Sequence, residues 1–318
     1  MSQFTTMRGI FAMLAAMVMF ITNDMFLKLA LSDLPLGEVI ALRSAAGALV
    51  LLVVILANGE ARLIRTAVHR RVAMRSGLDA LTTFTYVLGL SMLPISTTTT
   101  IYMAAPLLTT ALAVPLLGEK VNGKRWMAIL VGFSGAVIVT RPAPDTFDMF
   151  ALLPLAAALC GSLRDISTRG IPMVVPGAVV AFSTAVGLTV GSSVFALWET
   201  WRVPDLFPAL CIVGSGVTFA LGNVLMVYAF RNAPVAAISP LRYVLVPCSL
   251  FYGYVIFSHV PDIWGISGTI LVVGAGLYAI RQEAVRGRDE ARARAAAAAR
   301  APSGAAMPAA VACSPPKS

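Results

Sequence analysis

The sequence predicts an all-α integral membrane protein with ten transmembrane helices, arranged as two inverted five-helix repeats. Three observations carry this prediction. The 318 residues are 58% hydrophobic and 12% charged, whereas soluble domains carry about 25% charged residues, so a lipid bilayer is the solvent that suits this chain. One structural unit occurs twice along the sequence. Lysine and arginine are concentrated in alternate connections between the apolar segments.

The repeated unit is a pair of apolar helices. Residues 94–142 predict two apolar helices joined by a short hydrophilic turn, and residues 234–281 repeat this plan. Pro106 and Pro247 hold matching positions 141 residues apart, and the tryptophans that open the second helix of each pair, at 126 and 264, lie 138 residues apart. Because the prolines, the turns and the small residues agree together, the sequence predicts an internal duplication.

Ten apolar segments are predicted to cross the bilayer, for which a helix needs about 20 residues. The first is too long for the apolar core of a signal peptide and is interrupted by Asn23, Asp24 and Lys28, so we expect it to be retained. The fourth and the ninth belong to the repeated unit and contain its prolines. The predicted spans are 9–31, 35–57, 76–93, 95–117, 126–139, 149–168, 176–198, 206–230, 235–257 and 263–280.

These spans divide the chain into four parts. A short N-terminus, 1–8, precedes a first repeat, 9–142, a second repeat, 143–282, and a tail, 283–318. The tail is rich in arginine and alanine and then bears prolines, which favours disorder. The alternative is a helix over its first part that lies along an anionic membrane surface.

Loop charge predicts the orientation. Basic residues cluster in the connection 58–75, in later alternate loops and in the tail, while the intervening loops hold little positive charge. Because cytoplasmic loops are enriched in lysine and arginine, both termini should be cytoplasmic in a multi-pass protein of the bacterial inner membrane. An odd number of spans per repeat then places the two repeats in opposite orientations, with their interface at the membrane midplane.

Composition and motifs also exclude several classes. The formal net charge of +9 is distributed as orientation signals are, so no nucleic-acid partner is expected. The four cysteines show no CxxC spacing, and we expect no metal site and no cofactor. The sequence has no phosphate-binding loop, HExxH or GxSxG motif, so no catalytic residues are assigned and the chain is not expected to be an enzyme.

Ionisable residues inside the spans are the candidates for a binding site, because each one near a helix centre costs about 2.5–3.5 kcal/mol on insertion scales. Asp24 and Lys28 stand at i and i+4, close enough for an ion pair that is either structural or accessible to a substrate. Arg43 and Arg242 should each lie about 12 Å deep, from opposite sides of the membrane. Aromatic and amide side chains could frame a heterocyclic ligand or simply pack. These further candidates are Tyr86, Tyr102, Asn223 and Tyr243.

The repeated motifs resemble a known family. Pro106-Leu107, followed by Leu117-Gly118-Glu119 and then Gly132-Phe133-Ser134-Gly135, is similar to the EamA repeat of the drug/metabolite transporter superfamily. Pro240-Leu241-Arg242-Tyr243 resembles the second EamA repeat, although Ser258-His259 stands where the family often repeats Gly-Glu. The polar residues Asn23-Asp24 and Arg164-Asp165 are similar to a bacterial branch that includes riboflavin and S-adenosylmethionine uptake carriers.

The resemblance implies a secondary transporter that moves a small organic metabolite, such as riboflavin or S-adenosylmethionine, by alternating access. An exporter of amino acids or toxic amphiphiles is the alternative within transport. An integral-membrane enzyme or a lipid-handling protein is the alternative from another class. The expected partners are a small-molecule substrate and membrane lipid, and a second copy of the chain in a homodimer is a further candidate.

Overall fold

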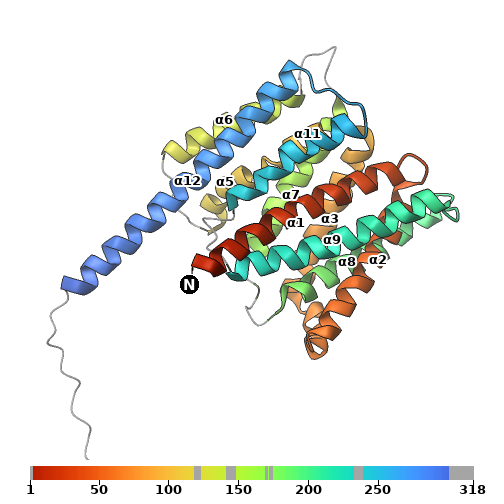
Figure 1. Ribbon diagram of the computed structural model, residues 1–318, viewed down its shortest axis with the longest axis horizontal. Helices are drawn as coiled ribbons and strands as arrows, with labels where there is room; N and C mark the ends of the chain where they lie inside the picture. The colour runs from red at the N-terminus through yellow and green to blue at the C-terminus, as the bar shows by residue number, and fades with distance from the viewer. Residues whose placement is uncertain are drawn as a thin grey trace, which may run out of the picture.

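The protein is a bundle of α-helices, seen in a computed structural model (Figure 1). The structure describes residues 3–117, 123–140, 148–168, 171, 175–232 and 239–300. No β-strand occurs among these residues. The α-helices of the first half are α1 (Gln3–Ala30), α2 (Leu36–Ala57), α3 (Arg70–Met92), α4 (Ile95–Tyr102), α5 (Ala105–Leu117) and α6 (Gly123–Thr140). Those of the second half are α7 (Leu152–Thr168), α8 (Gly177–Ser193), α9 (Leu206–Asn232), α11 (Leu245–Val255) and α12 (Ile263–Arg300). Short 3₁₀ helices are η1 (Ala61–Val68), η2 (Met149–Ala151), η3 (Val194–Leu197) and η4 (Ser239–Val244).

Many of these helices are suited to a bilayer. Within the described part of the chain, five helical segments are long and apolar enough to cross a membrane, and four further apolar helices are shorter. This confirms the all-α membrane class. The total of ten crossings stays a prediction, since α3 carries Asp79 and several arginines and is not among these nine segments.

The helix pairs follow the duplication. α1 packs along α9, α3 along α7, α2 along α8, α4 along α11, and α6 along α12; Figure 1 shows the α1–α9 and α6–α12 pairs side by side. Exchanging each span of one half with its counterpart in the other leaves this set of pairs unchanged, as a two-fold relation between the halves requires. α3 and α7 run antiparallel, because Gly89 lies against Pro154 while Asp79 contacts Arg164.

The fourth predicted span is broken instead of continuous. α4 ends at Tyr102 and α5 begins at Ala105. The physical reason is Pro106, which lacks the N–H that would bond to the carbonyl of Tyr102 one turn earlier. The ninth span is interrupted in the corresponding place, where η4 gives way to α11 just before Pro247. Among the described residues, the fourth and the ninth spans are thus both discontinuous, a feature that places free backbone groups near the middle of a bundle.

The glycines of the repeated unit allow α6 and α12 to touch along their backbones. A Cβ atom at Gly135 would lie 2.8 Å from the carbonyl oxygen of Gly268, and one at Gly268 would lie 2.6 Å from that of Gly135. Small residues are the usual means by which membrane helices approach so closely. The small-residue face of the sequence is thus the contact face of this helix pair.

Gly135→Ala is expected to destabilise the protein, because the new methyl group meets backbone atoms that cannot move aside alone. We expect a loss of about 1–3 kcal/mol, typical of overpacking, visible as a lower melting temperature of the purified protein. Gly274→Ala is the matched control, since a Cβ atom there meets nothing within 4 Å. Equal melting temperatures for the two variants would contradict the close contact.

The last helix is longer than the sequence analysis expected. α12 continues to Arg300, so the helix considered as the alternative for the first part of the tail is the form seen, and its placement on a membrane surface stays a prediction. Alanine, arginine and glutamate have high helix propensity, which explains the continuation. In Figure 1 the end of α12 extends beyond the helical bundle. Residues 301–318 lie outside the described part of the chain.

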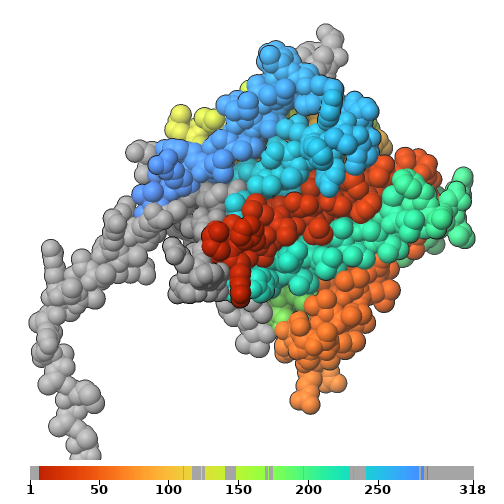
Figure 2. All heavy atoms as spheres, in the orientation of Figure 1, coloured from red at the N-terminus to blue at the C-terminus, as the bar shows by residue number. Residues whose placement is uncertain are grey.

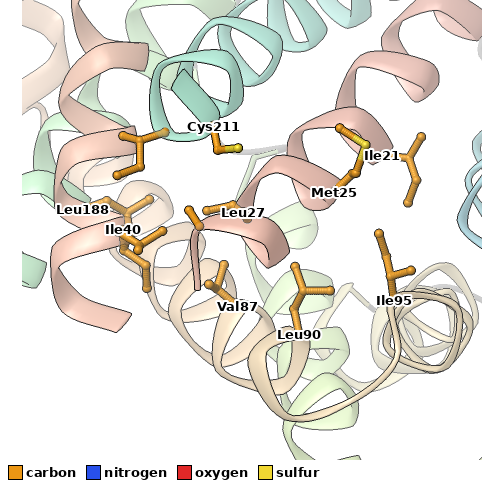
Figure 3. Packing of buried hydrophobic residues seen from close by; sticks show 12 residues of the cluster. Ile21, Met25, Leu27, Ile40, Val87, Leu90, Ile95, Leu188 and Cys211 are labelled. Carbon is orange, nitrogen blue, oxygen red and sulfur yellow. The ribbon is translucent and has the colours of Figure 1, made fainter. Parts of the chain in front are cut away.

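One end of the bundle is closed by an apolar cluster. Figure 3 shows side chains from α1, α2, α3, α4, α8 and α9 pointing toward one another, among them Leu27, Ile40, Leu90 and Cys211. In the predicted orientation this is the outer end. In the space-filling view, α1 lies between α9 on one side and α11 and α12 on the other (Figure 2).

The loop after α11 shows where the chain departs from the family pattern. Ser258 has a φ of 49°, in the left-handed region that glycine adopts most readily. The serine therefore keeps a backbone conformation suited to glycine, and the N–H of His259 donates a hydrogen bond to the carbonyl of Gly253 at 2.8 Å. The matching Gly118-Glu119 lies outside the described residues.

Candidate functional site

The candidate site is centred on the carboxylate of Asp24, on α1. The side chain of Asn23 donates a hydrogen bond to Asp24 Oδ1 at 2.8 Å, and Asn23 Oδ1 accepts one from Ser215 on α9 at 2.8 Å. The hydroxyl of Tyr86 on α3 donates to Asp24 Oδ2 at 2.8 Å. Both carboxylate oxygens are thus held by neutral donors, and Asp24 forms no ion pair with any described residue.

Two tyrosines extend the site from Asp24 toward the break in the fourth span. Tyr86 Oη lies 3.3 Å from the hydroxyl of Thr99 on α4. Its ring meets that of Tyr102 edge-on, with 5.0 Å between the ring centroids. Asp24, Tyr86 and Tyr102 are each only partly buried, although their contacts are with neighbouring helices of the bundle. The three side chains therefore form a continuous polar and aromatic surface between α1, α3 and α4.

Lys28 does not form the predicted ion pair with Asp24. Its Nζ donates to the carbonyl oxygens of Leu90 and Leu93, at 2.7 and 2.6 Å, and lies 5.8 Å from the centroid of the Phe257 ring. The physical reason is the end of α3, where the last carbonyls have no partner in their own helix and attract a cation. Lys28 therefore caps α3, away from the carboxylate.

Arg43 approaches the same region from α2. Its side chain is only 2% exposed, and its guanidinium carbon lies 4.4 Å from the centroid of the Phe219 ring on α9. Asp24 and Asp79 both interact with it through their charges, but neither is in contact with it. Nε and Nη1 of Arg43 have no hydrogen-bond partner among the described residues.

A second polar cluster lies on the cytoplasmic side in the predicted orientation. Arg75 contacts Asp79 at 3.0 Å within α3, and Arg164 on α7 contacts the same carboxylate at 2.7 Å. Arg164 also donates to Asp165 at 2.8 Å, and Arg75 donates to Thr184 on α8 at 3.2 Å. This ionic cluster joins α3, α7 and α8.

The remaining predicted residues are placed less centrally. Arg242 in η4 is half-buried, and its charge reaches Tyr102. The amide of Asn223 donates to the carbonyl of Phe219 in its own helix at 2.9 Å. Tyr243 is 3% exposed and packs against Gly276 of α12, so it belongs to the core between η4 and α12. Of the predicted residues, the structure thus brings Asp24, Tyr86 and Tyr102 into contact, and Arg43 contacts Phe219 instead.

Several residues of this region were not singled out from the sequence as site residues. Asn23 and Ser215 orient the carboxylate, Thr99 contacts Tyr86, and Phe219 supports Arg43. Asp79 is the exception that a signal could have revealed, because it is an acidic residue within an apolar span and calls for a partner. That partner is Arg164, on α7.

The fold and the site define a class of protein: an α-helical membrane protein with a polar centre inside its helical bundle. The EamA-like transporter family model matches residues 7–141. An S-adenosylmethionine uptake transporter of Rickettsia bellii is 30% identical over 203 residues, covering 64% of this chain and 69% of that protein. The chain belongs to the EamA-like transporter family and is a multi-pass protein of the inner membrane.

Other relatives differ in the names they carry. A riboflavin transporter of Brucella anthropi is 26% identical, and the match covers 74% of this chain and 85% of that protein. The pseudopaline exporter CntI of Pseudomonas aeruginosa is 25% identical, covering 84% and 94%. A solved crystal structure whose title names no function covers 86% of this chain and 96% of its own, with a TM-score of 0.64 and 19% identity. That last likeness supports the fold alone.

Proposed function

We propose that the protein is a secondary transporter that imports a small organic metabolite by alternating access, with S-adenosylmethionine as the leading substrate and riboflavin as the next. The observation that carries the proposal is the carboxylate of Asp24, held beside the Tyr86–Tyr102 pair at the meeting of several helices. A carboxylate beside aromatic rings suits a ligand that combines a cationic group with a heterocycle. S-adenosylmethionine, named for one relative, has both features, and riboflavin, named for another, has the heterocycle.

Alternating access needs a site between two closures. The apolar cluster around Leu27 and Leu90 supplies one closure, and the ionic cluster of Arg75, Asp79 and Arg164 supplies the other. The Asp24 site adjoins the apolar cluster, against which Tyr86 packs, and Asp79 of the ionic cluster lies seven residues nearer the start of α3. Transport then requires each closure to part in turn, with both termini in the cytoplasm.

Counterflow in proteoliposomes tests the proposal without assuming a coupling ion. Vesicles containing the purified protein are loaded with unlabelled S-adenosylmethionine, and entry of the labelled compound is followed, because exchange alone drives its accumulation. We expect accumulation well above that of protein-free vesicles, and none when the interior holds an unrelated sugar. If neither S-adenosylmethionine nor riboflavin exchanges, the proposed substrates are wrong.

An exporter is the second candidate, favoured by the relative named as a pseudopaline exporter. The two directions are separated in intact cells that express the protein. Import predicts faster entry of the labelled compound, whereas export predicts faster loss from cells loaded beforehand.

A further inference from the structure

Arg43 is the most deeply buried charged group near the site. Its side chain is 2% exposed, its ring contact with Phe219 covers one face of the guanidinium, and Nε and Nη1 have no hydrogen-bond partner among the described residues. A charged donor left in this condition is strongly unfavourable in a membrane interior. We therefore expect an acceptor from outside the described residues to accept hydrogen bonds from this guanidinium.

The two nearest carboxylates do not serve as that acceptor. Asp79 already receives Arg75 and Arg164, at 3.0 and 2.7 Å. Asp24 is held by Asn23 and Tyr86 through both of its oxygens. Neither carboxylate forms an ion pair with Arg43, so Nε and Nη1 of Arg43 have no acceptor among the described residues.

From this geometry we infer that Arg43 binds an anionic group of the transported molecule, and that this group is a carboxylate. The planar guanidinium, fixed in place by Phe219, suits a planar acceptor with two oxygens. This inference rests on the proposed function, since it assigns the anionic end of the same ligand. The substrate class is then a zwitterionic heterocycle, with its cationic group toward Asp24 and its carboxylate toward Arg43.

Binding measurements on the purified full-length protein test the assignment. The probes are S-adenosylmethionine and decarboxylated S-adenosylmethionine, which lacks only the carboxylate. The variants are Arg43→Gln and, as a matched control, Arg65→Gln, because Arg65 is an exposed arginine of η1. The wild type and the control should bind the carboxylated probe at least about tenfold more tightly than the decarboxylated one, as the loss of a charge-assisted hydrogen bond implies. Arg43→Gln should bind both probes equally.

The melting temperature without ligand separates a binding role of Arg43 from a structural one. Loss of a structural residue would lower it, whereas loss of a binding residue would not. Arg43→Gln should melt at the wild-type temperature or above it, because the variant no longer buries a cation without hydrogen bonds. A lower melting temperature would show that the guanidinium supports the fold and would overturn the inference.

Equal binding of the two probes by the wild type would overturn the inference as well, and would leave the proposed transport intact if counterflow is observed. If neither S-adenosylmethionine nor riboflavin exchanges, the proposed substrates fail and the melting temperature of Arg43→Gln still decides the role of Arg43.

Discussion

Asp24→Asn is expected to reduce counterflow of S-adenosylmethionine by about 10- to 100-fold, the loss that removal of a charge-assisted contact implies. The asparagine side chain has nearly the same shape and can still accept the hydrogen bond from Tyr86. The fold should therefore persist while the negative charge at the centre of the site is lost. The measurement is the initial counterflow rate, normalised to the protein recovered in the vesicles.

Asp33→Asn is the matched control for this variant. It makes the same substitution on an exposed residue just beyond the end of α1 and should transport at the wild-type rate. Tyr86→Phe provides a second comparison, because it removes the hydroxyl that donates to Asp24 and keeps the ring that meets Tyr102. Wild-type counterflow by Asp24→Asn would remove the carboxylate from the mechanism.

Arg164→Gln is expected to have the largest effect on stability. It leaves Asp79 with only Arg75 as its ionic partner and removes the partner of Asp165. These side chains are only 14–31% exposed, so water cannot fully replace the lost contacts. Breaking a buried ion pair from one side costs about 3–5 kcal/mol, which corresponds to a fall in melting temperature of roughly 5–15 °C for a protein of this size. Thermal unfolding of the purified protein provides the measurement.

The double variant separates this pair from a general loss of charge. Arg164→Gln combined with Asp79→Asn should lose less stability than the sum of the two single variants, because the contact between Arg164 and Asp79 can be removed only once. Arg65→Gln, on an exposed arginine, should leave the melting temperature unchanged. Additive losses in the double variant would mean that Arg164 and Asp79 do not stabilise each other.

The sequence by itself determined those features that depend on local composition. The apolar stretches, the repeated proline and glycine positions and the basic connections identified a membrane bundle with an internal duplication. The contact between Gly135 and Gly268 fulfils the role expected of the small residues. A bilayer crossing needs only a sufficient apolar length, and a helix break needs only a proline, so both can be recognised within a single segment.

Tertiary structure alone decided which polar groups meet. Asp24 and Lys28 are neighbours on one helix, yet Asp24 receives Tyr86 from α3 and Lys28 caps the end of α3. Tyr243, adjacent in sequence to Arg242, packs against Gly276 instead of facing the site. Arg164 and Asp79, 85 residues apart, form one ion pair. The physical reason is that a charge in an apolar interior must find its partner wherever the packing of helices brings one, and that packing is a property of the whole bundle.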